Sequence, residues 1–466
     1  VYYRDRAWHI FDGDDGATRN LTAGLETPFA NEDHDYPRPA PGYGVADWIE
    51  GDRAVLIYDK YDLWLFPTGG GEPLSLTEGR GRRESTTYRV VDLDDDRDYL
   101  RVDERLLLSA YHHERKTSGF CEARAGQPGV RPLVGGQYKL SFVAKARKAE
   151  RLVYTRESYN EFPDLRVAER SLDSSRRLSD ANPTIADFAW GEAELVEWRS
   201  ADGIPLQGVL IKPGGYEPGK RYPVLVYFYR FFSQRLHEFN EPVVNHRPSF
   251  PVYASHGYAV FLPDIRFEVG RPGFSATKCL VPGIQRLVDM GVADPDAIGL
   301  HGHSLSGYQA AFVVTQTDIF AAAVAGAPVS NMTSAYGGIR WRTGMARQFQ
   351  YERTQSRLGG TLWDSRDRYI DNSPLFFADR VNTPLLIQHG DDDGAVPWYQ
   401  SIELYLALRR LGKECIFLQY RGEPHHLQKY PNKLDYSIKM KQFFDHHLKN
   451  EPAPAWMTKG VPYRGE

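Results

Sequence analysis

The stretch that decides the fold reads Ile298-Gly299-Leu300-His301-Gly302-His303-Ser304-Leu305-Ser306-Gly307-Tyr308. Its first residues are small or apolar and favour a buried strand, and the Ala- and Val-rich run that follows favours a helix. A strand that turns sharply into a helix around Gly-x-Ser is typical of a nucleophile elbow, which holds the serine at the carboxyl end of the strand. The same short motif also occurs as an ordinary buried turn, so the segments downstream must decide between these interpretations.

Two later segments supply the partners that a serine nucleophile needs. A predicted strand at 383–390 runs into three consecutive aspartates at 391–393, and a second predicted strand at 415–420 runs into a loop with two histidines at 425 and 426. A serine hydroxyl requires a general base, and the base requires a carboxylate that orients it. The order Ser, Asp, His, each after a later strand, predicts an α/β-hydrolase fold, a mostly parallel doubly wound sheet, with a Ser-His-Asp triad.

From about Glu194 to the C-terminus, the chain resembles the catalytic domain of the prolyl oligopeptidase family of serine peptidases, which includes dipeptidyl and acylaminoacyl peptidases. Members carry Gly-His-Ser-aromatic-Gly-Gly-Tyr at the elbow, and this chain has Gly-His-Ser-Leu-Ser-Gly-Tyr at 302–308. The resemblance implies that Ser304 is the nucleophile. It selects Asp393 as the acid, because the family's acid stands three residues before a Val, and His425 as the base, because the family's base lies in Glu-x-His.

The chain departs from the family pattern beside the nucleophile. Leu305 replaces a bulky aromatic residue, and Ser306 replaces a glycine. A serine is small enough to keep the turn, at a cost of about 1 kcal/mol if its φ is positive. We therefore expect an altered but competent elbow.

The resemblance also implies an oxyanion hole made of the Leu305 N–H and a tyrosine hydroxyl at the end of an earlier strand. Tyr227 stands where the family's Val-Tyr falls and is the first choice. Tyr229 lies on the same face by strand alternation, in a buried strand expected at 221–229, and is the alternative. A core tyrosine with its hydroxyl bonded elsewhere is the third interpretation. Residues 230–232, Arg-Phe-Phe, replace the small residues of the family, so the shape of this loop is open.

Short strands joined by Gly/Asp turns recur through the N-terminal region, for example around Trp8, around Trp64 and before Leu178. A recurrence of roughly 45–55 residues is typical of β-propeller blades, and a generic antiparallel β domain is the alternative. We expect about four blades in residues 1–188, an incomplete propeller, followed by the hydrolase domain in residues 189–466. The family resemblance implies seven or eight blades, so we expect the first blades to lie upstream of Val1.

Composition bounds the remaining possibilities. A net charge of −4 over 466 residues favours neither nucleic acid nor an anionic membrane as a partner. No apolar run approaches the ~20 residues of a spanning helix. The three histidine pairs in the sequence (112–113, 425–426 and 446–447) lack metal-ligand spacing, so no metal and no cofactor is assigned. If an upstream signal peptide was removed, the protein is periplasmic or secreted, and otherwise it is cytoplasmic.

Taken together, these patterns predict acyl transfer to water, and the resemblance implies short peptides as substrates. An esterase with the same triad is one alternative, and a catalytically silent binding scaffold, favoured by Ser306 and the Phe-rich loop, is another. Activity that depends on the upstream blades, and a homo-oligomer, both stay open. The Arg- and aromatic-rich segment 331–379 is a candidate wall of the substrate pocket. The segment 432–449 is expected as an amphipathic helix with Leu434, Ile438, Phe443 and Phe444 as its main apolar residues.

Overall fold

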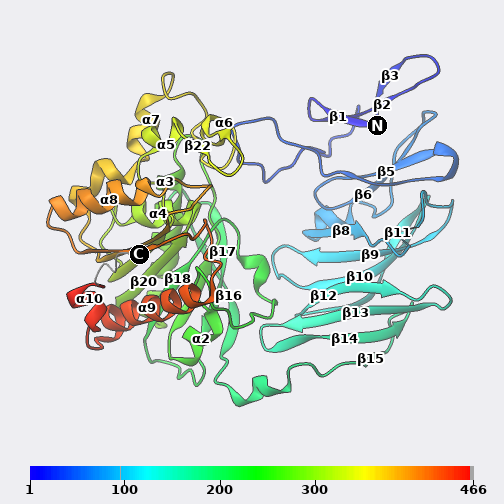
Figure 1. Cartoon of the computed structure of the whole chain (residues 1–466). Coiled ribbons are helices and arrows are strands. Elements are labelled where there is room, and N and C mark those ends of the chain that lie inside the picture. The colour runs from blue at the N-terminus through cyan, green and yellow to red at the C-terminus, as the bar shows by residue number, and fades with distance from the viewer. Residues whose placement is uncertain (95, 462–466) are drawn as a thin grey trace. The chain divides into compact units, whose positions relative to one another are not determined.

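The computed structural model describes residues 1–94 and 96–461 (Figure 1). The chain forms two compact units. The first contains residues 1–34, 38–184 and the short segment 234–239, and the second contains residues 35–37, 185–233 and 240–466. The sequence predicted a division after residue 188, close to the change of unit that follows Thr184.

The strands of the first unit form antiparallel sheets from consecutive segments of the chain, and four such sheets lie within its described residues. The first sheet contains β1 (Tyr2–Arg4), β2 (Ala7–Phe11) and β3 (Thr18–Asn20). The second contains β4 (Val45–Trp48), β5 (Ala54–Tyr58), β6 (Leu63–Pro67) and β7 (Leu74–Ser75). The third contains β8 (Thr86–Val90), β9 (Arg105–His112), β10 (Ser118–Arg124) and β11 (Gln127–Gly136). The fourth contains β12 (Lys139–Lys145), β13 (Arg151–Ser158), β14 (Glu161–Glu169) and β15 (Ser175–Arg177), and Figure 1 shows the sheets in chain order.

Strand alternation explains why these sheets stack as propeller blades do. On β9, Leu106 and Leu108 belong to the cluster shared with the second sheet, whereas Leu107 belongs to the cluster shared with the fourth. On β5, Val55 and Ile57 likewise pack toward the first sheet. Because successive side chains of a strand point to opposite faces, a fully apolar strand can fill the cores on both sides of its sheet.

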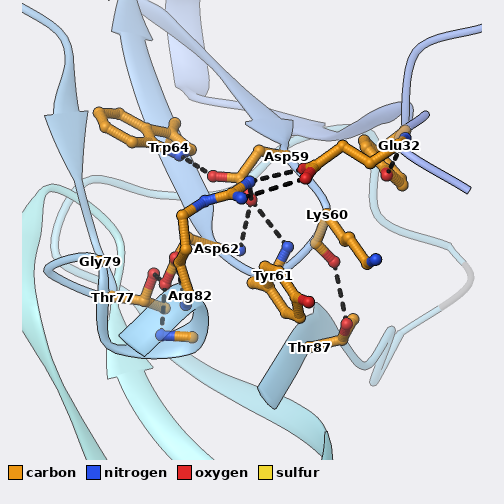
Figure 2. A network of polar contacts seen from close by, with 12 residues as sticks. Glu32, Asp59, Lys60, Tyr61, Asp62, Trp64, Thr77, Gly79, Arg82 and Thr87 are labelled. Atoms are coloured by element: carbon orange, nitrogen blue, oxygen red, sulfur yellow. Dashed lines mark hydrogen bonds and ion pairs between the residues drawn. The ribbon is translucent and has the colours of Figure 1, made fainter. Parts of the chain in front are cut away.

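A buried polar network fixes the turns of the second sheet (Figure 2). Asp59 is fully buried and accepts hydrogen bonds from the backbone N–H groups of Tyr61 and Asp62 and from the indole Nε1 of Trp64. The carboxylate of Asp62, also buried, accepts from Thr77 Oγ1 and from the first turn of α1 (Arg80–Arg83). Burial raises the pKa of Asp59, and its hydrogen bonds oppose that shift. These carboxylates therefore replace backbone partners at a sharp turn.

The second unit is built on an eight-stranded sheet with the order β16-β17-β19-β18-β20-β21-β24-β25 in its described residues. The strands are β16 (Glu192–Arg199), β17 (Pro205–Lys212), β18 (Tyr222–Tyr227), β19 (Ala259–Pro263), β20 (Ala293–His303), β21 (Ala322–Gly326), β24 (Leu385–Gly390) and β25 (Cys415–Tyr420). The pairs from β19 to β25 are parallel, and β16 and β17 add an antiparallel edge. A short hairpin of β22 (Ile339–Arg340) and β23 (Met345–Ala346) lies outside this sheet.

Helices cover both faces of this sheet. The α-helices in the described part of the second unit are α2 (Phe250–Ser255), α3 (Pro272–Asp289), α4 (Leu305–Val313), α5 (Met332–Tyr336), α6 (Gln348–Glu352), α7 (Arg366–Asp371), α8 (Tyr399–Arg410), α9 (Tyr430–Lys449) and α10 (Ala455–Lys459). On β20, Ile298 and Leu300 face the cluster formed with α3, α4 and α8, whereas a Cβ on Gly299 would meet Leu448 and Phe444 of α9. The predicted α/β-hydrolase fold with an all-β N-terminal region is confirmed.

The C-terminal helix differs from its prediction in one respect. Phe443 and Phe444 are buried as expected, but Leu434 and Ile438 are exposed by 38% and 48%. The buried face instead continues through Tyr436 and Met440. These two residues lie one helical turn apart and in line with Phe443 and Phe444, so spacing rather than hydropathy identifies the packed face.

Among the described residues, we find no helix that combines the length and the apolar character needed to cross a membrane.

Candidate active site

The turn between β20 and α4 has the geometry of a nucleophile elbow. Ser304 has φ 61° and ψ −119°, a conformation that a residue with a side chain adopts only under strain. Two glycines make the turn possible. A Cβ on Gly302 would lie 1.9 Å from the carbonyl oxygen of Ser306, and a Cβ on Gly307 would lie 2.1 Å from the carbonyl oxygen of Gly326. Strand and helix therefore approach too closely for any larger residue at these two positions.

Ser306 fits this turn without backbone strain. It lies inside α4, and its φ is not positive, so the cost that the sequence analysis attached to a positive φ does not arise. Its hydroxyl is fully buried, accepts a hydrogen bond from the backbone N–H of His303 and donates one to the carbonyl oxygen of His303, both at 3.0 Å. The serine thus connects the first turn of the helix to the last residue of the strand.

The acid and the base predicted from the sequence lie together at the carboxyl ends of β24 and β25. His425 Nδ1 and Asp393 Oδ2 are 2.7 Å apart. The other oxygen, Oδ1, accepts from the backbone N–H groups of Ala395 and Val396. Burial alone raises the pKa of the Asp393 carboxyl, but hydrogen bonds from His389 and His425 hold it well below its usual range. Asp393 is therefore an ionised, fixed acceptor for the His425 ring.

The neighbouring acidic residues have other roles. Asp391 accepts from the backbone N–H of Gly422 and from Gln419, and Asp392 is exposed. Glu423 of the Glu-x-His motif is buried, and its carboxylate accepts from the backbone N–H groups of Gln428 and Lys429. It thereby folds the loop that carries His425.

A second histidine, which the sequence pattern did not single out, contacts the Asp393 carboxylate. His389, fully buried at the end of β24, has its Nε2 3.0 Å from Asp393 Oδ2 and its Nδ1 2.7 Å from Ser401 Oγ. If Ser401 donates to Nδ1, Nε2 carries the proton and donates to the carboxylate. The residue stands four positions before Asp393, and that short spacing after a buried strand was the only signal for it in the sequence.

The two tyrosines considered for the oxyanion hole have different surroundings. Tyr227 is the last residue of β18, and its ring packs among those of Phe232, Phe250 and His301. Tyr229 lies in the loop beyond the strand, and its hydroxyl is hydrogen-bonded with the hydroxyl of Ser304. Burial raises the pKa of Tyr229, and the hydrogen bonds with Ser304 and Gln355 oppose that shift. Of the two tyrosines, Tyr229 is thus the one whose hydroxyl interacts with the Ser304 side chain.

The loop after β18 and the segment 331–379 complete the surroundings of the elbow. Asp264 Oδ1 accepts from the backbone N–H groups of Phe232 and Ser233, which fixes the loop despite its large residues. Gln355 donates to the Tyr229 hydroxyl, and the buried Arg347 donates to the carbonyl oxygen of Ala395 in the acid loop. The segment 331–379 therefore contacts the candidate site, whereas its Trp363 is 80% exposed.

Three comparisons with known proteins place the chain. The Prolyl oligopeptidase family profile matches residues 277–451, which include Ser304, Asp393 and His425. The chain is 26% identical over 299 residues to the "Uncharacterized peptidase YuxL" of Bacillus subtilis, covering 59% of this chain and 42% of that protein. It is 28% identical over 298 residues to mouse dipeptidyl peptidase 8, covering 59% of this chain and 29% of that protein.

A solved structure agrees with the sequence comparisons on the fold. The uncomplexed Pyrococcus horikoshii acylaminoacyl peptidase aligns with a TM-score of 0.60 at 20% identity, over 95% of this chain and 67% of that one. Residues 277–451 are thus similar to the prolyl oligopeptidase family, and they lie within an α/β-hydrolase fold. The chain spans less than half the length of the two sequence relatives named above.

Proposed function

We propose that this protein is a serine peptidase that hydrolyses short peptides through an acyl-enzyme on Ser304. The observation that carries the proposal is the 2.7 Å contact between His425 Nδ1 and Asp393 Oδ2 beside a strained elbow. The ring of His425 lies 5.0 Å, centroid to centroid, from the ring of His303, the residue before Ser304. This supports a base within reach of the nucleophile.

In the proposed reaction, Ser304 Oγ attacks the scissile carbonyl carbon and passes its proton to His425 Nε2. The Nδ1–H of the same ring donates to Asp393, which holds the tautomer and stabilises the imidazolium. His425 then protonates the leaving amine as the carbon–nitrogen bond breaks. Water, deprotonated by the same ring, attacks the acyl-enzyme and releases the acid and free Ser304.

The oxyanion of each tetrahedral intermediate requires donors that are already in place. We assign them to the Leu305 N–H, at the start of α4, and to the Tyr229 hydroxyl. The assignment of Tyr229 in preference to Tyr227 rests on its hydrogen bond with Ser304. Such donors act strongly because they are held at the position where charge develops.

The substrate class is proposed from similarity to known proteins. Both sequence relatives named above are peptidases by name. An esterase would use the same triad, so the ratio of peptide to ester kcat/KM for matched substrates decides between them. If the protein is a peptidase, the wild type should cleave an amide substrate. Substitution of Asp393 or His425 should then lower kcat/KM for the amide and for the matched ester in parallel.

The decisive experiment is labelling of the intact chain with a fluorophosphonate probe, followed by peptide mapping. Labelling at Ser304 that disappears in Ser304→Ala and falls strongly in His425→Ala is the expected result. Ser255→Ala is the matched control, because Ser255 lies in the same unit at the end of α2 and donates a hydrogen bond to the carbonyl oxygen of Pro251 within the same helix. Undiminished hydrolysis in a folded Ser304→Ala variant would overturn the proposal.

A further inference from the structure

Three histidines from separate parts of the second unit converge beside the candidate triad. They are His246, from the loop before α2, His303, at the end of β20, and His426, next to the base. One ring nitrogen of each lies within 4.8 Å of the others. The ring centroid of His246 lies 4.4 Å from that of His303 and 4.2 Å from that of His426. No local sequence pattern indicates this cluster, because 57 positions separate the first two members and 123 the last two.

The buried member of the cluster lacks ordinary partners. His303 is only 3% exposed, and neither of its ring nitrogens has a hydrogen-bond partner among the described residues. A buried polar group without a partner costs free energy, so such a group calls for a ligand. The ring also occupies space that a glycine leaves for it, because a Cβ on Gly326 would lie 2.6 Å from His303 Nδ1. The position of this imidazole is therefore built into the sheet.

We propose that His246, His303 and His426 bind a divalent transition-metal ion, with Zn²⁺ as the expected occupant. Three imidazole nitrogens are a donor set that Zn²⁺ accepts, with a fourth position left for water, whereas Ca²⁺ and Mg²⁺ prefer oxygen ligands. The rings of His246 and His426 are stacked with an interplanar angle of 6°. Since in-plane lone pairs of parallel rings do not converge, the exposed His426 ring rotates when the ion binds.

The positive charge near the three histidines indicates that the ion binds reversibly and is not a permanent part of the protein. Arg247 and Lys433 act electrostatically on His246 with positive charge, which opposes a cation. Asp393 acts on His426 with negative charge, but among the described residues no carboxylate belongs to the three-histidine group itself. We therefore expect weaker binding than that of a structural zinc site, and release by a chelator.

Binding should inhibit the enzyme, a consequence that, unlike the binding itself, rests on the proposed function. Two of the ligands are the chain neighbours of Ser304 and His425. The ion would hold His426 in a rotated position next to the base and would place a divalent charge near the ring that becomes an imidazolium during attack. Both effects raise the barrier to acyl transfer, because preorganised charge of the wrong sign destabilises the transition state.

The test is a titration of the metal-free, intact chain with Co²⁺, whose tetrahedral complexes absorb strongly in the visible range, followed by competition with Zn²⁺. We expect one ion per chain and loss of the band when Zn²⁺ is added. His246→Ala and, separately, His426→Ala should weaken binding at least about tenfold, because loss of a ligand costs no less than loss of an outer-shell partner. The second variant changes an exposed residue and keeps the test valid if the first does not fold.

His446→Ala is the matched control, since His446 and His447 form a similar pair on α9, with ring centroids 4.7 Å apart. Its Co²⁺ band should equal that of the wild type. Absence of a band, or a band that persists in both His246→Ala and His426→Ala, would overturn the metal site.

Measurements of hydrolysis distinguish a failure of the metal-site proposal from a failure of the proposed function. Zn²⁺ should inhibit the wild type reversibly, with activity restored by a chelator, and should inhibit His246→Ala far less. Failure of all hydrolysis with an intact Co²⁺ band would reject the peptidase and keep the metal site. Active hydrolysis that Zn²⁺ leaves unchanged, together with an absent Co²⁺ band, would reject the metal site and keep the peptidase.

Discussion

Both units of the chain contain a fully buried aspartate that accepts several hydrogen bonds, yet the donors differ in kind. In the first unit, Asp59 accepts from two backbone N–H groups and from the indole of Trp64 (Figure 2). In the second, Asp393 accepts from two backbone N–H groups and from the imidazoles of His389 and His425. The pKa is raised for Asp59 and lowered for Asp393.

The difference teaches which buried carboxylates have a structural role and which can take part in chemistry. Backbone and indole N–H groups do not titrate near neutral pH, so these donors let Asp59 fix a turn but exchange no proton with it. An imidazole can take up a proton, so an ionised carboxylate beside it changes the energy of a reactive state. Burial is the same in both places, and the partner determines the function.

The sharpest way to break this comparison is to neutralise Asp393. In Asp393→Asn the shape is kept, but the amide cannot hold the His425 tautomer, and kcat should fall by about 10⁴-fold with little change in fold. Asp392→Asn is the control, because this neighbour is exposed, and its kinetics should match the wild type. Steady-state kinetics with one chromogenic peptide measures kcat for both variants. If kcat falls only modestly in Asp393→Asn, Asp393 is not a member of the triad.

A second prediction applies the same distinction to the two tyrosines. Tyr229→Phe removes the hydroxyl that meets Ser304 and should lower kcat by about 10²–10³-fold, the usual cost of one oxyanion donor. Tyr227→Phe should change kcat little, because the ring of Tyr227 packs among aromatic rings and can keep that packing. If Tyr227→Phe lowers kcat strongly and Tyr229→Phe does not, Tyr227 is the tyrosine of the oxyanion hole.

The third prediction concerns stability in the first unit. Asp59→Asn places an amide N–H group against a donor, and should lower the free energy of unfolding by up to about 3 kcal/mol without changing kcat. Since the folded pKa of Asp59 is raised, the wild-type carboxyl contributes most stability below its unfolded pKa and loses that contribution as the pH rises through the folded pKa. The loss caused by Asp59→Asn should therefore be larger at pH 4 than at pH 7.

Urea unfolding followed by circular dichroism at the two pH values measures this loss. Glu32→Gln is a suitable control, since Glu32 forms a partly exposed ion pair with Arg82, which should contribute less than about 1 kcal/mol. A loss that grows as the pH rises would mean that Asp59 is stabilised as an ion, in the manner of Asp393, by Arg82 Nη2 at 3.6 Å.

The sequence predicted those features that depend on order and periodicity. The elbow, the two later loops and the strand-turn repeats each follow from local spacing, and the fold class is confirmed by the structure and its neighbours. The choice among three consecutive aspartates required the family resemblance, because their local sequence is the same. Only the structure shows that the Asp393 carboxylate, rather than that of Asp391 or Asp392, meets a histidine at 425.

Contacts between residues that are far apart in the sequence could not be predicted from it. Strand alternation placed Tyr227 and Tyr229 on one face, but β18 ends at Tyr227, and alternation no longer governs the loop beyond it. Gln355 reaches Tyr229 from 126 positions away, and His246 reaches His303, at the end of β20, from the loop before α2. Neither residue stands in a motif, since polar residues in loops are common and only the tertiary structure selects these two.

The smallest effect is expected at Ser306, the departure from the family pattern that most favoured a silent scaffold. Ser306→Ala removes the two hydrogen bonds to the backbone of His303 and should cost about 1 kcal/mol of stability. Fluorophosphonate labelling of Ser304 should persist at nearly the wild-type rate, because the glycines at 302 and 307, rather than residue 306, provide the close approach of strand and helix. Loss of labelling in a folded Ser306→Ala variant would show that the hydroxyl holds the elbow in its reactive conformation. Ser306 would then belong with Asp393 among the polar groups that serve chemistry, rather than with Asp59 among those that fix a turn.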